Sequence, residues 1–307
     1  MKEKIRKYIK KNLTPKQPEI IKKIKRVLLN VKKNQIFYSK RIRDKKRELF
    51  FKYFYRGERP NVKIILTDFS GYPLYRKKPI CKSLIDCGIG NFFDNAMKYI
   101  AGVDFEVILI ITSEDSESKE ILNRYESLLP KYPFIKKLFL VDNRFFDFGA
   151  YNRGYQYLRS TDYRGDVVFM NSSVRGPYNN YWLLKYSYLF HSNKNIGLCG
   201  ISLNSHTTHL QTYVFKPHVQ SFFMYTSMVV LTSVFGASLF EEVDVPISKI
   251  DVISKCEIGF SQKILEHGYG ICSALFENFV YYKGNKWRVP KWDLRYNPLY
   301  NQFANIL

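Results

Sequence analysis

The chain has 307 residues, of which 46% are hydrophobic and 25% charged, so its length fits one large domain or two ordinary ones. Lys and Arg number 49 against 27 Asp and Glu, which gives a formal net charge of +22. This composition excludes collagen-like, coiled-coil and disulfide-scaffold proteins, and the chain is too apolar to be disordered.

The excess positive charge lies near the N-terminus. Residues 1–60 contain 22 Lys and Arg but only 5 Asp and Glu, whereas the remaining residues contain 27 and 22. Apolar residues recur among the basic ones at roughly helical spacing, which predicts a basic amphipathic helical arm over residues 1–58. Such an arm is typical of a protein that lies on an anionic membrane surface, although a solvated or disordered tail has the same composition. Nucleic-acid binding also fits the charge, but the sequence has no zinc-finger spacing and no RNA-recognition aromatic motif.

Beyond Pro60, short apolar runs alternate with helical patterns. The apolar runs predict strands at 62–69, 105–112, 135–141, 166–170, 196–203 and 219–224. Helical patterns predict helices at 91–100, 116–129, 149–158 and 255–267, the last ending before Gly268. This alternation indicates crossover connections, and hence an α/β (Rossmann-like) domain with a mostly parallel sheet flanked by helices, over residues 59–280. The aromatic and basic stretch 281–307 predicts a C-terminal tail packed on this domain.

Three sequence features bear on the cellular compartment. The first 30 residues contain no apolar run long enough for a signal peptide. The uncharged stretch 222–240 approaches the length of a membrane span, but its Ser, Thr and Gly residues favour a buried strand that runs into a buried helix. The five cysteines are scattered without a C-x-x-C pair, which favours a reducing compartment, and no Cys/His cluster has the spacing of a zinc site.

Ligands of open α/β sheets bind beyond the carboxyl ends of the strands, and two segments at such positions are rich in polar and small residues. The first reads VDNRFFDFGAYNRGY and contains Asp147, Asn152 and Arg153. Its glycines and the start of a helix would let backbone amides approach an anion. A tight turn that only allows the helix to lie close to the sheet is equally consistent with this spacing.

The second segment reads DVVFMNSSVRGPY. Here the strand ends in Asn171, Ser172 and Ser173, and Arg175 follows. Groups at this place could hold a diphosphate or its metal ion. Taken by itself, the pattern also fits a capped strand end with a Gly-Pro turn.

Together, the two segments resemble nucleotide-sugar glycosyltransferases of the GT-A fold, and in particular the rhamnan-synthesis (RgpF-like) and family 2 polysaccharide-biosynthesis enzymes. Two later segments support the resemblance. HVQSFFMYTS, from His218, is similar to the His-x-Gln-Ser strand of those relatives, and CEIGFSQKILEHGYGI, from Cys256, is similar to the family 2 helix that begins with the catalytic acidic pair. The resemblance covers about residues 61–280.

The resemblance places the triplet Asn171, Ser172 and Ser173 where many GT-A enzymes have a metal-binding Asp-x-Asp. Asn and Ser are poor ligands for a hard divalent cation, so no residue is assigned as a metal ligand and a Mg²⁺ or Mn²⁺ requirement stays open. Arg175, Arg153 or backbone amides at a helix end would then compensate the charge of the diphosphate.

The resemblance also implies roles for the acidic residues. Glu257 falls on the second position of the acidic pair and is expected to be the catalytic base, while Cys256 stands at the first position. An acid favoured by the dipole of the helix N-terminus is the alternative for Glu257. Asp147 matches the acid of an Asp-x-Gly-Ala motif and is expected to contact the donor or the acceptor. Asp68, at the end of the first strand, stands where GT-A enzymes often hold the base or ribose.

His218, Gln220 and Ser221 are expected to line the pocket on the acceptor side, although a histidine on a strand is more often structural. The resemblance therefore predicts a glycosyltransferase in surface polysaccharide biosynthesis. It would move a hexosyl or deoxyhexosyl group from a UDP-, GDP- or dTDP-sugar to a hydroxyl of a lipid-linked glycan, with inversion at the anomeric carbon. The expected location is the cytoplasm, peripheral on the inner face of the cell membrane, with the anionic membrane surface as a partner. The alternative is a catalytically degenerate relative that binds glycan or acts as a scaffold at the membrane.

Overall fold

The computed structural model describes residues 61–80, 83–205, 215–240, 248–277 and 279–287. By its internal contacts the chain divides into two units, Met1–Gly57 and Glu58–Leu307. All described residues belong to the second unit. The predicted basic arm, residues 1–58, lies outside the described residues, as does most of the predicted tail, so both stay predictions. Within the described start of the tail, the Trp287 ring contacts the rings of Phe215, Phe279 and Tyr281.

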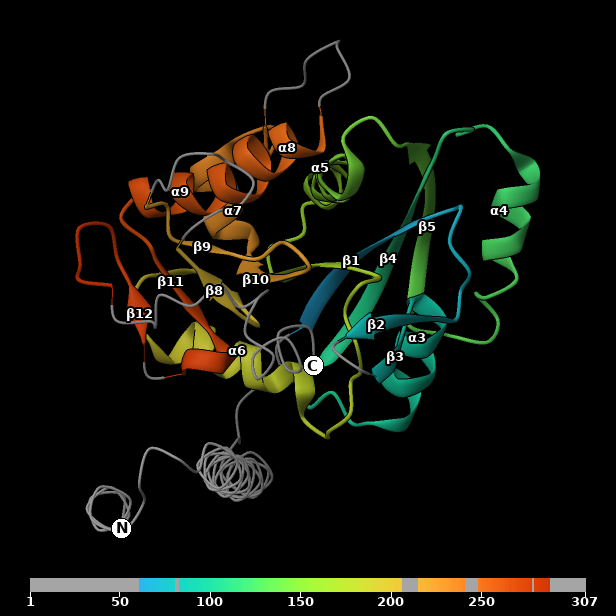
Figure 1. Ribbon diagram of the computed structural model, residues 1–307, viewed down its shortest axis with the longest axis horizontal. Coiled ribbons are helices and arrows are strands. Elements are labelled where there is room, and N and C mark those ends of the chain that lie inside the picture. The colour runs from blue at the N-terminus through green and yellow to red at the C-terminus, as the bar shows by residue number, and fades with distance from the viewer. Residues whose placement is uncertain (1–60, 81–82, 206–214, 241–247, 278, 288–307) are drawn as a thin grey trace, which may run out of the picture. The chain divides into compact units, whose positions relative to one another are not determined.

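An eight-stranded sheet forms the centre of the domain, in the order β12-β11-β7-β10-β6-β1-β4-β5 (Figure 1). Its strands are β1 (Asn61–Phe69), β4 (Asp104–Ser113), β5 (Ile135–Asp142), β6 (Asp166–Asn171), β7 (Ile196–Gly200), β10 (Phe223–Ser227), β11 (Gly270–Ser273) and β12 (Val280–Tyr281). Most of these strands are buried along nearly their whole length, as expected where helices cover both faces of a sheet.

The strand directions determine which loops meet. β6, β1, β4 and β5 run parallel to one another, and β10 runs antiparallel between β6 and β7. Asn171 at the end of β6 is in register with Thr67 of β1, and Met170 is in register with Phe223 at the start of β10. The carboxyl ends of β1 and β6 and the segment that leads into β10 therefore share one edge of the sheet.

Helices cover both faces of this sheet. Their bounds are α3 (Ile89–Lys98), α4 (Lys119–Glu126), α5 (Phe146–Ser160), α6 (Trp182–Ser192), α7 (Met228–Phe235), α8 (Lys249–Asp251), the π-helix η1 (Val252–Ile258), α9 (Gly259–Glu266) and the 3-10 helix η2 (Ala274–Phe276). On one face, Phe169 of β6 contacts Tyr151 of α5 and Phe260 of α9. On the other face, Phe105 of β4 contacts Trp182 of α6. The predicted α/β architecture, a mostly parallel sheet flanked by helices, is confirmed.

Some elements differ from the sequence predictions. The segment predicted as a loop after β1 contains β2 (Arg76–Ile80), which pairs with β3 (Ser83–Cys87). The strand predicted at 219–224 is divided into β9 (His218–Val219), which pairs with β8 (Leu203–Asn204), and β10. The helix predicted at 255–267 consists of part of the π-helix η1 followed by α9, which ends at Glu266. Gly268, two residues later, has a φ of 82° that suits glycine after a helix. Helix α6 was not predicted, because its residues are buried on most sides and show little amphipathic periodicity.

The uncharged stretch 222–240 contains β10 and α7, as the sequence predicted. Ser227 ends the strand and caps the helix, because its hydroxyl accepts a hydrogen bond from the backbone amide of Val230. Within the part of the chain that the structure describes, no helix has the length and apolar character needed to cross a bilayer.

The close approach of α5 to β1 depends on Gly154. A Cβ atom at this position would lie 2.6 Å from Cγ2 of Ile65, which is fully buried. Gly154→Ala is therefore expected to lower the free energy of unfolding by about 1–3 kcal/mol, the usual cost of overpacking a core. Urea unfolding would measure the change. Gly259→Ala is the matched control, since its Cβ would meet only the Ser254 carbonyl oxygen at 3.8 Å; equal stability of the two variants would contradict the prediction.

Candidate active site

Asp147 and Asn171 meet at the carboxyl edge of the sheet. Asp147 lies in the first turn of α5, and Asn171 is the last residue of β6. The Asn171 side-chain amide donates a hydrogen bond to Oδ2 of Asp147 at 2.7 Å. Oδ1 of Asn171 accepts one from the backbone amide of Ser173 at 3.0 Å. Asn171 therefore orients the Asp147 carboxylate and the loop that follows β6 together.

Glu257 lies in the π-helix η1, and its carboxylate is held from one side. Oε2 accepts hydrogen bonds from the backbone amide of Ser221 at 3.0 Å and from the Ser221 hydroxyl. Oε1 lies 3.8 Å from Nε2 of His218. A π-helical turn rotates side chains away from regular α-helical positions and is often found at functional sites. Here it accompanies the placement of Glu257 against the segment that leads into β10.

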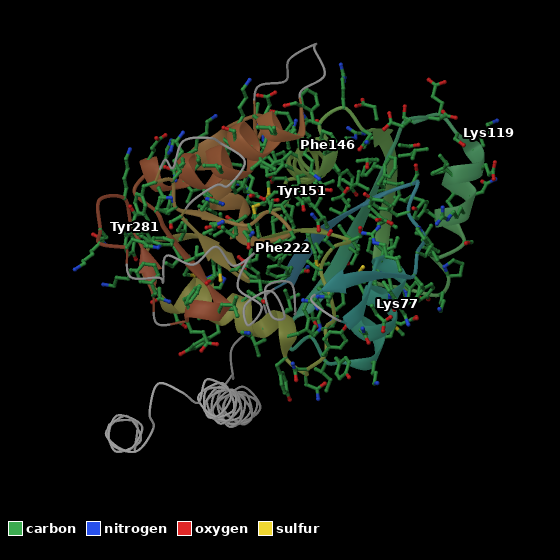
Figure 2. All side chains as sticks on the ribbon, viewed as in Figure 1. Lys77, Lys119, Phe146, Tyr151, Phe222 and Tyr281 are labelled. Carbon is green, nitrogen blue, oxygen red and sulfur yellow. The ribbon has the colours of Figure 1, made fainter. Side chains whose placement is uncertain are left out.

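Tyr151 of α5 connects the two carboxylates. Its hydroxyl donates a hydrogen bond to the backbone carbonyl oxygen of Ser221 at 2.9 Å. Burial raises the pKa of Tyr151 well above its usual value, and the nearby Asp147 and Glu257 carboxylates raise this pKa further. Figure 2 labels Tyr151 and Phe222, the residue after Ser221, in the central part of the domain. The structure therefore brings Asp147, Asn171, Ser221 and Glu257 into one group around a neutral tyrosine.

His218 and Gln220 border this group. His218 is buried, and its Nδ1 lies 2.8 Å from the carbonyl oxygen of Lys216. Because a carbonyl oxygen only accepts, Nδ1 carries the proton in this contact, and the Nε2 atom faces Glu257. Oε1 of Gln220 accepts a hydrogen bond from the Ser202 hydroxyl at 2.6 Å, which ties this segment to the end of β7.

Asp68 and Ser172 lie together on the opposite face of the same strand ends. The Asp68 side chain is completely buried, and Nη1 of Arg76 lies 3.6 Å from its Oδ1. The Ser172 hydroxyl accepts a hydrogen bond from Nη2 of Arg76 at 2.6 Å. Arg76 was not predicted as a site residue, because it belongs to the hairpin β2–β3, which the sequence predicted as a loop. The sequence shows it only as one basic residue among several after the first strand.

The structure places the three other predicted residues at separate positions. Arg175 is buried near Tyr178 and Cys87, and burial lowers its pKa. Oδ1 of Asn152 accepts hydrogen bonds from the Ser238 hydroxyl and the Leu239 amide, so this side chain anchors the chain that follows α7. The Arg153 guanidinium lies over the ring of Phe139 on β5, 4.7 Å from its centroid. Asn152 and Arg153 thus have described contacts away from the group around Tyr151.

The side chains at the end of β6 do not fit a divalent metal site. Asn171 uses both polar atoms of its amide, and the Ser172 hydroxyl accepts from a cationic arginine. Across the described ranges, no three His, Cys, Asp or Glu side chains come together in a way that could hold a metal ion. Hard cations need several oxygen ligands, which these residues do not offer.

The pH dependence of stability provides a test of the burial of Asp68. Burial raises the pKa of Asp68 from 3.8 to about 6 in the folded protein, although Ser172 and Arg76 oppose the shift. Since the folded state binds this proton more tightly than the unfolded state, the stabilisation is present below about pH 4 and is lost between about pH 4 and 6. The pKa difference corresponds to about 3 kcal/mol.

Asp68→Asn removes this titration. The free energy of unfolding of the variant, relative to the unchanged protein, is therefore expected to rise by up to about 3 kcal/mol between pH 4 and pH 7. Urea unfolding at both pH values measures this difference. A difference that does not change with pH would show that Asp68 is not buried as a high-pKa carboxyl.

A family model matches the sequence across these elements. The model of rhamnan synthesis protein F matches residues 108–280, which is more than half of the chain. The chain belongs to the rhamnan synthesis protein F family. The resemblance predicted from sequence motifs is therefore confirmed. The family match contains Asp147, Asn171, Ser221 and Glu257, whereas Asp68 and Arg76 precede it.

Solved structures show weaker similarity to this member of the rhamnan synthesis protein F family. One is a mannosyltransferase from Pyrobaculum calidifontis in complex with GDP-mannose and Mn²⁺, with 11% identity and a TM-score of 0.43, covering 70% of this chain and 55% of that one. Another is a cytidylyltransferase from Leptospira borgpetersenii serovar Hardjo-bovis, with 11% identity and a TM-score of 0.37, covering 71% and 76%. The chain thus spans about half the length of the mannosyltransferase. Comparison with curated proteins gives no match.

Proposed function

We propose that this protein is a glycosyltransferase that uses a nucleotide sugar in polysaccharide synthesis. The observation that carries the proposal is the connection of Glu257, through Ser221 and Tyr151, to the strand-end residues Asp147 and Asn171. A transfer reaction needs a proton acceptor within reach of the donor site, and the Glu257 carboxylate would be that acceptor. Membership of the rhamnan synthesis protein F family supports the same class of reaction.

In the proposed reaction the nucleotide sugar lies against the ends of β1 and β6. Asp147 would bind hydroxyls of the sugar, and the polar groups of Ser172 and Ser173 would face the diphosphate. Glu257 would take the proton from a hydroxyl of the acceptor. The oxygen would then form a bond with the anomeric carbon while the bond from this carbon to the diphosphate breaks, and the nucleoside diphosphate leaves with inversion.

On this proposal Oε1 of Glu257 is the proton acceptor. Ser221 donates two hydrogen bonds to Oε2, so this oxygen is occupied and the carboxylate cannot rotate freely. Oε1 faces the Nε2 atom of His218 at 3.8 Å, on the side where the acceptor would enter. General-base assistance of this kind contributes about 10²–10⁴-fold to a rate.

The acceptor would bind near His218, Gln220 and Ser221. A lipid-linked acceptor would account for the basic residues of the segment 1–58, because an anionic membrane surface attracts such a segment. On this proposal the protein is peripheral on the inner face of the membrane. Deletion of residues 1–58 is then expected to release the protein from anionic liposomes, as measured by co-sedimentation, without changing nucleotide-sugar binding. Full retention of the truncated protein would contradict the membrane role.

A thermal-shift screen with UDP-, GDP- and dTDP-sugars, each with and without Mn²⁺, tests the donor class. One nucleotide class is expected to raise the melting temperature, because a ligand that binds only the folded state stabilises it. The stabilising sugar nucleotide is then incubated with the protein, and release of the nucleoside diphosphate is followed. Stabilisation by none of the donors would contradict the proposed function.

A catalytically degenerate glycan-binding or scaffolding protein is the second candidate. Two departures from the resemblance favour it: Asn171 and Ser173 stand at the two acidic positions of the metal-binding Asp-x-Asp, and Cys256 stands at the first acid of the catalytic pair. A scaffold of this kind would bind glycan without binding or hydrolysing any sugar nucleotide. Isothermal titration with the same donors therefore distinguishes the two candidates.

A further inference from the structure

The buried charge pair Asp68–Arg76 has no role in the reaction described above. The Asp68 side chain is 0% exposed and that of Arg76 is 11% exposed, and their closest charged atoms are 3.6 Å apart. This separation exceeds that of a good hydrogen bond. Among the described residues, the Nε and Nη1 atoms of Arg76 are buried without a hydrogen-bond partner, while hydrogen bonding from Ser172 and from the Phe69 backbone lowers the pKa of Asp68.

Burying a charge pair with unsatisfied hydrogen-bonding atoms lowers the stability of the ligand-free protein. Charged groups removed from water are stabilised only when their hydrogen bonds are satisfied, and an ion pair without them does not recover the cost of dehydration. The Tyr125 hydroxyl of α4, also buried and without a described hydrogen-bond partner, lies in the same environment as Asp68 and Arg76. Several buried polar atoms that lack hydrogen-bond partners therefore lie at one strand end. This points to a ligand that forms the missing hydrogen bonds.

Ser172 and Tyr72 hold the Arg76 guanidinium in place, but its Nε and Nη1 groups donate no hydrogen bond among the described residues. Nη2 donates to the Ser172 hydroxyl at 2.6 Å, and the Tyr72 ring lies 4.1 Å from the guanidinium carbon. Tyr72 is 47% exposed, so a change in its side-chain rotamer would uncover the guanidinium. A guanidinium has five N–H donors in a planar fork, which matches the paired oxygens of a phosphate. Arg76 therefore has the chemistry of a phosphate-binding residue at a place next to the predicted diphosphate site.

The groups around Asp68 and Arg76 restrain the position of the Arg76 side chain. Asp147 of α5 lies close enough to Asp68 to raise the pKa of its carboxyl, whereas Ser172 and Arg76 lower this pKa. The loop before Arg76 is fixed by Arg124, which donates hydrogen bonds to the carbonyl oxygens of Ser70 and Tyr72 at 3.1 and 2.9 Å. The backbone just before Arg76 is thus held in place by Arg124.

We propose that Arg76 binds the diphosphate of the nucleotide sugar, and that Asp68 restrains the guanidinium until this anion arrives. The inference rests on the proposed function and adds to it a donor-binding residue outside the family match. An entering diphosphate offers the guanidinium bidentate, charge-assisted hydrogen bonds that Asp68 does not make. Asp68 then competes with the ligand for Arg76, so the two residues have opposite effects on diphosphate affinity.

Isothermal titration of the full chain with GDP, UDP and dTDP, and with guanosine, uridine and thymidine, tests this inference. Arg76→Gln is expected to weaken the binding of the preferred nucleoside diphosphate about 10- to 100-fold, while nucleoside binding stays within about twofold. Asp68→Asn is expected to tighten diphosphate binding about threefold or more, because it removes the competing carboxylate.

Arg164→Gln is the matched control. Arg164 precedes β6 at the opposite edge of the sheet, its side chain is 80% exposed, and it pairs with Asp162 at 2.7 Å. This variant is expected to bind like the unchanged protein. If Arg76→Gln does not fold, the double variant Asp68→Asn/Arg76→Gln, which removes both buried charges, is expected to show the same selective loss of diphosphate affinity.

Three results would overturn the inference: diphosphate affinity of the Arg76 variant equal to that of the Arg164 control, an equal loss for nucleosides and diphosphates, or weaker diphosphate binding by the Asp68 variant. Each of these, obtained on a protein that binds a nucleoside diphosphate, leaves the proposed function standing. If the unchanged protein binds none of the three diphosphates, the inference and the proposed function fail together.

Discussion

Glu257→Gln is expected to lower the rate of sugar transfer by about 10²–10⁴-fold while nucleotide-sugar binding stays within about twofold. Glutamine has nearly the same shape, so its side-chain oxygen can still accept the two hydrogen bonds from Ser221. The amide nitrogen would then occupy the place of Oε1, where it cannot take a proton from the acceptor. Only the chemical step is therefore affected. Turnover with the donor identified in the thermal-shift screen, and titration with the same donor, measure the two quantities.

Glu266→Gln is the control for this substitution. Glu266 is the last residue of α9, lies in the same helical segment as Glu257, and is half-exposed beside Lys283. Its replacement removes the same charge without touching the group around Tyr151, so transfer is expected to proceed at the normal rate. Normal turnover by the Glu257 variant would remove Glu257 from the mechanism. Loss of donor binding by this variant would assign it a binding role instead.

Asn171→Asp is expected to lower the free energy of unfolding by about 1–3 kcal/mol at pH 7. The substitution puts a carboxylate in place of a hydrogen-bond donor that lies 2.7 Å from Oδ2 of Asp147. Two carboxylates at this separation repel each other. One of them is then expected to take up a proton at a higher pH in the folded protein than in the unfolded protein. The loss of stability should therefore shrink as the pH falls toward about 4.

Asn143→Asp provides a matched comparison. The Asn143 side-chain amide donates to Oε1 of Glu114 at 3.0 Å, so it makes the same kind of contact, but on the exposed surface. Solvent screens the repulsion there, and the change in unfolding free energy is expected to stay within about 0.5 kcal/mol. Urea unfolding of both variants at pH 7 and pH 4 measures the difference. Equal effects would mean that the contact between Asn171 and Asp147 does not stabilise the site.

Much of the site could be predicted because local sequence determines where strands end. The apolar run before Asn171 and the glycines after Asp147 mark a strand end and a helix start, and parallel strands bring such ends to one edge. Sequence motifs also indicated Ser221 and Glu257, which contact each other although 36 residues separate them. Their hydrogen bond could not be derived from spacing, since it depends on the π-helix and on the reversed direction of β10.

Arg153 and Arg76 illustrate what sequence could not resolve. Both are basic residues in segments that follow a predicted strand, yet Arg153 lies over Phe139 of β5 while Arg76 reaches Asp68 and Ser172. Residues that neighbour each other on α5 point to different sides of the helix, so Arg153 and Asp147 need not serve one site. Arg76 comes from a hairpin whose position depends on contacts distant in sequence, such as the bond from Gly88 to the Ser172 carbonyl oxygen.

Amino-acid sequence alone was sufficient for the α/β class, for the order of most strands and helices along the chain, and for family membership, because hydrophobic periodicity and short motifs are local properties. The pairing of Asp68 with Arg76, the bridging role of Tyr151 and the anchoring role of Asn152 became apparent only in three dimensions. They depend on which elements the sheet order brings together, and that order follows from the combined burial of all the elements rather than from any one segment.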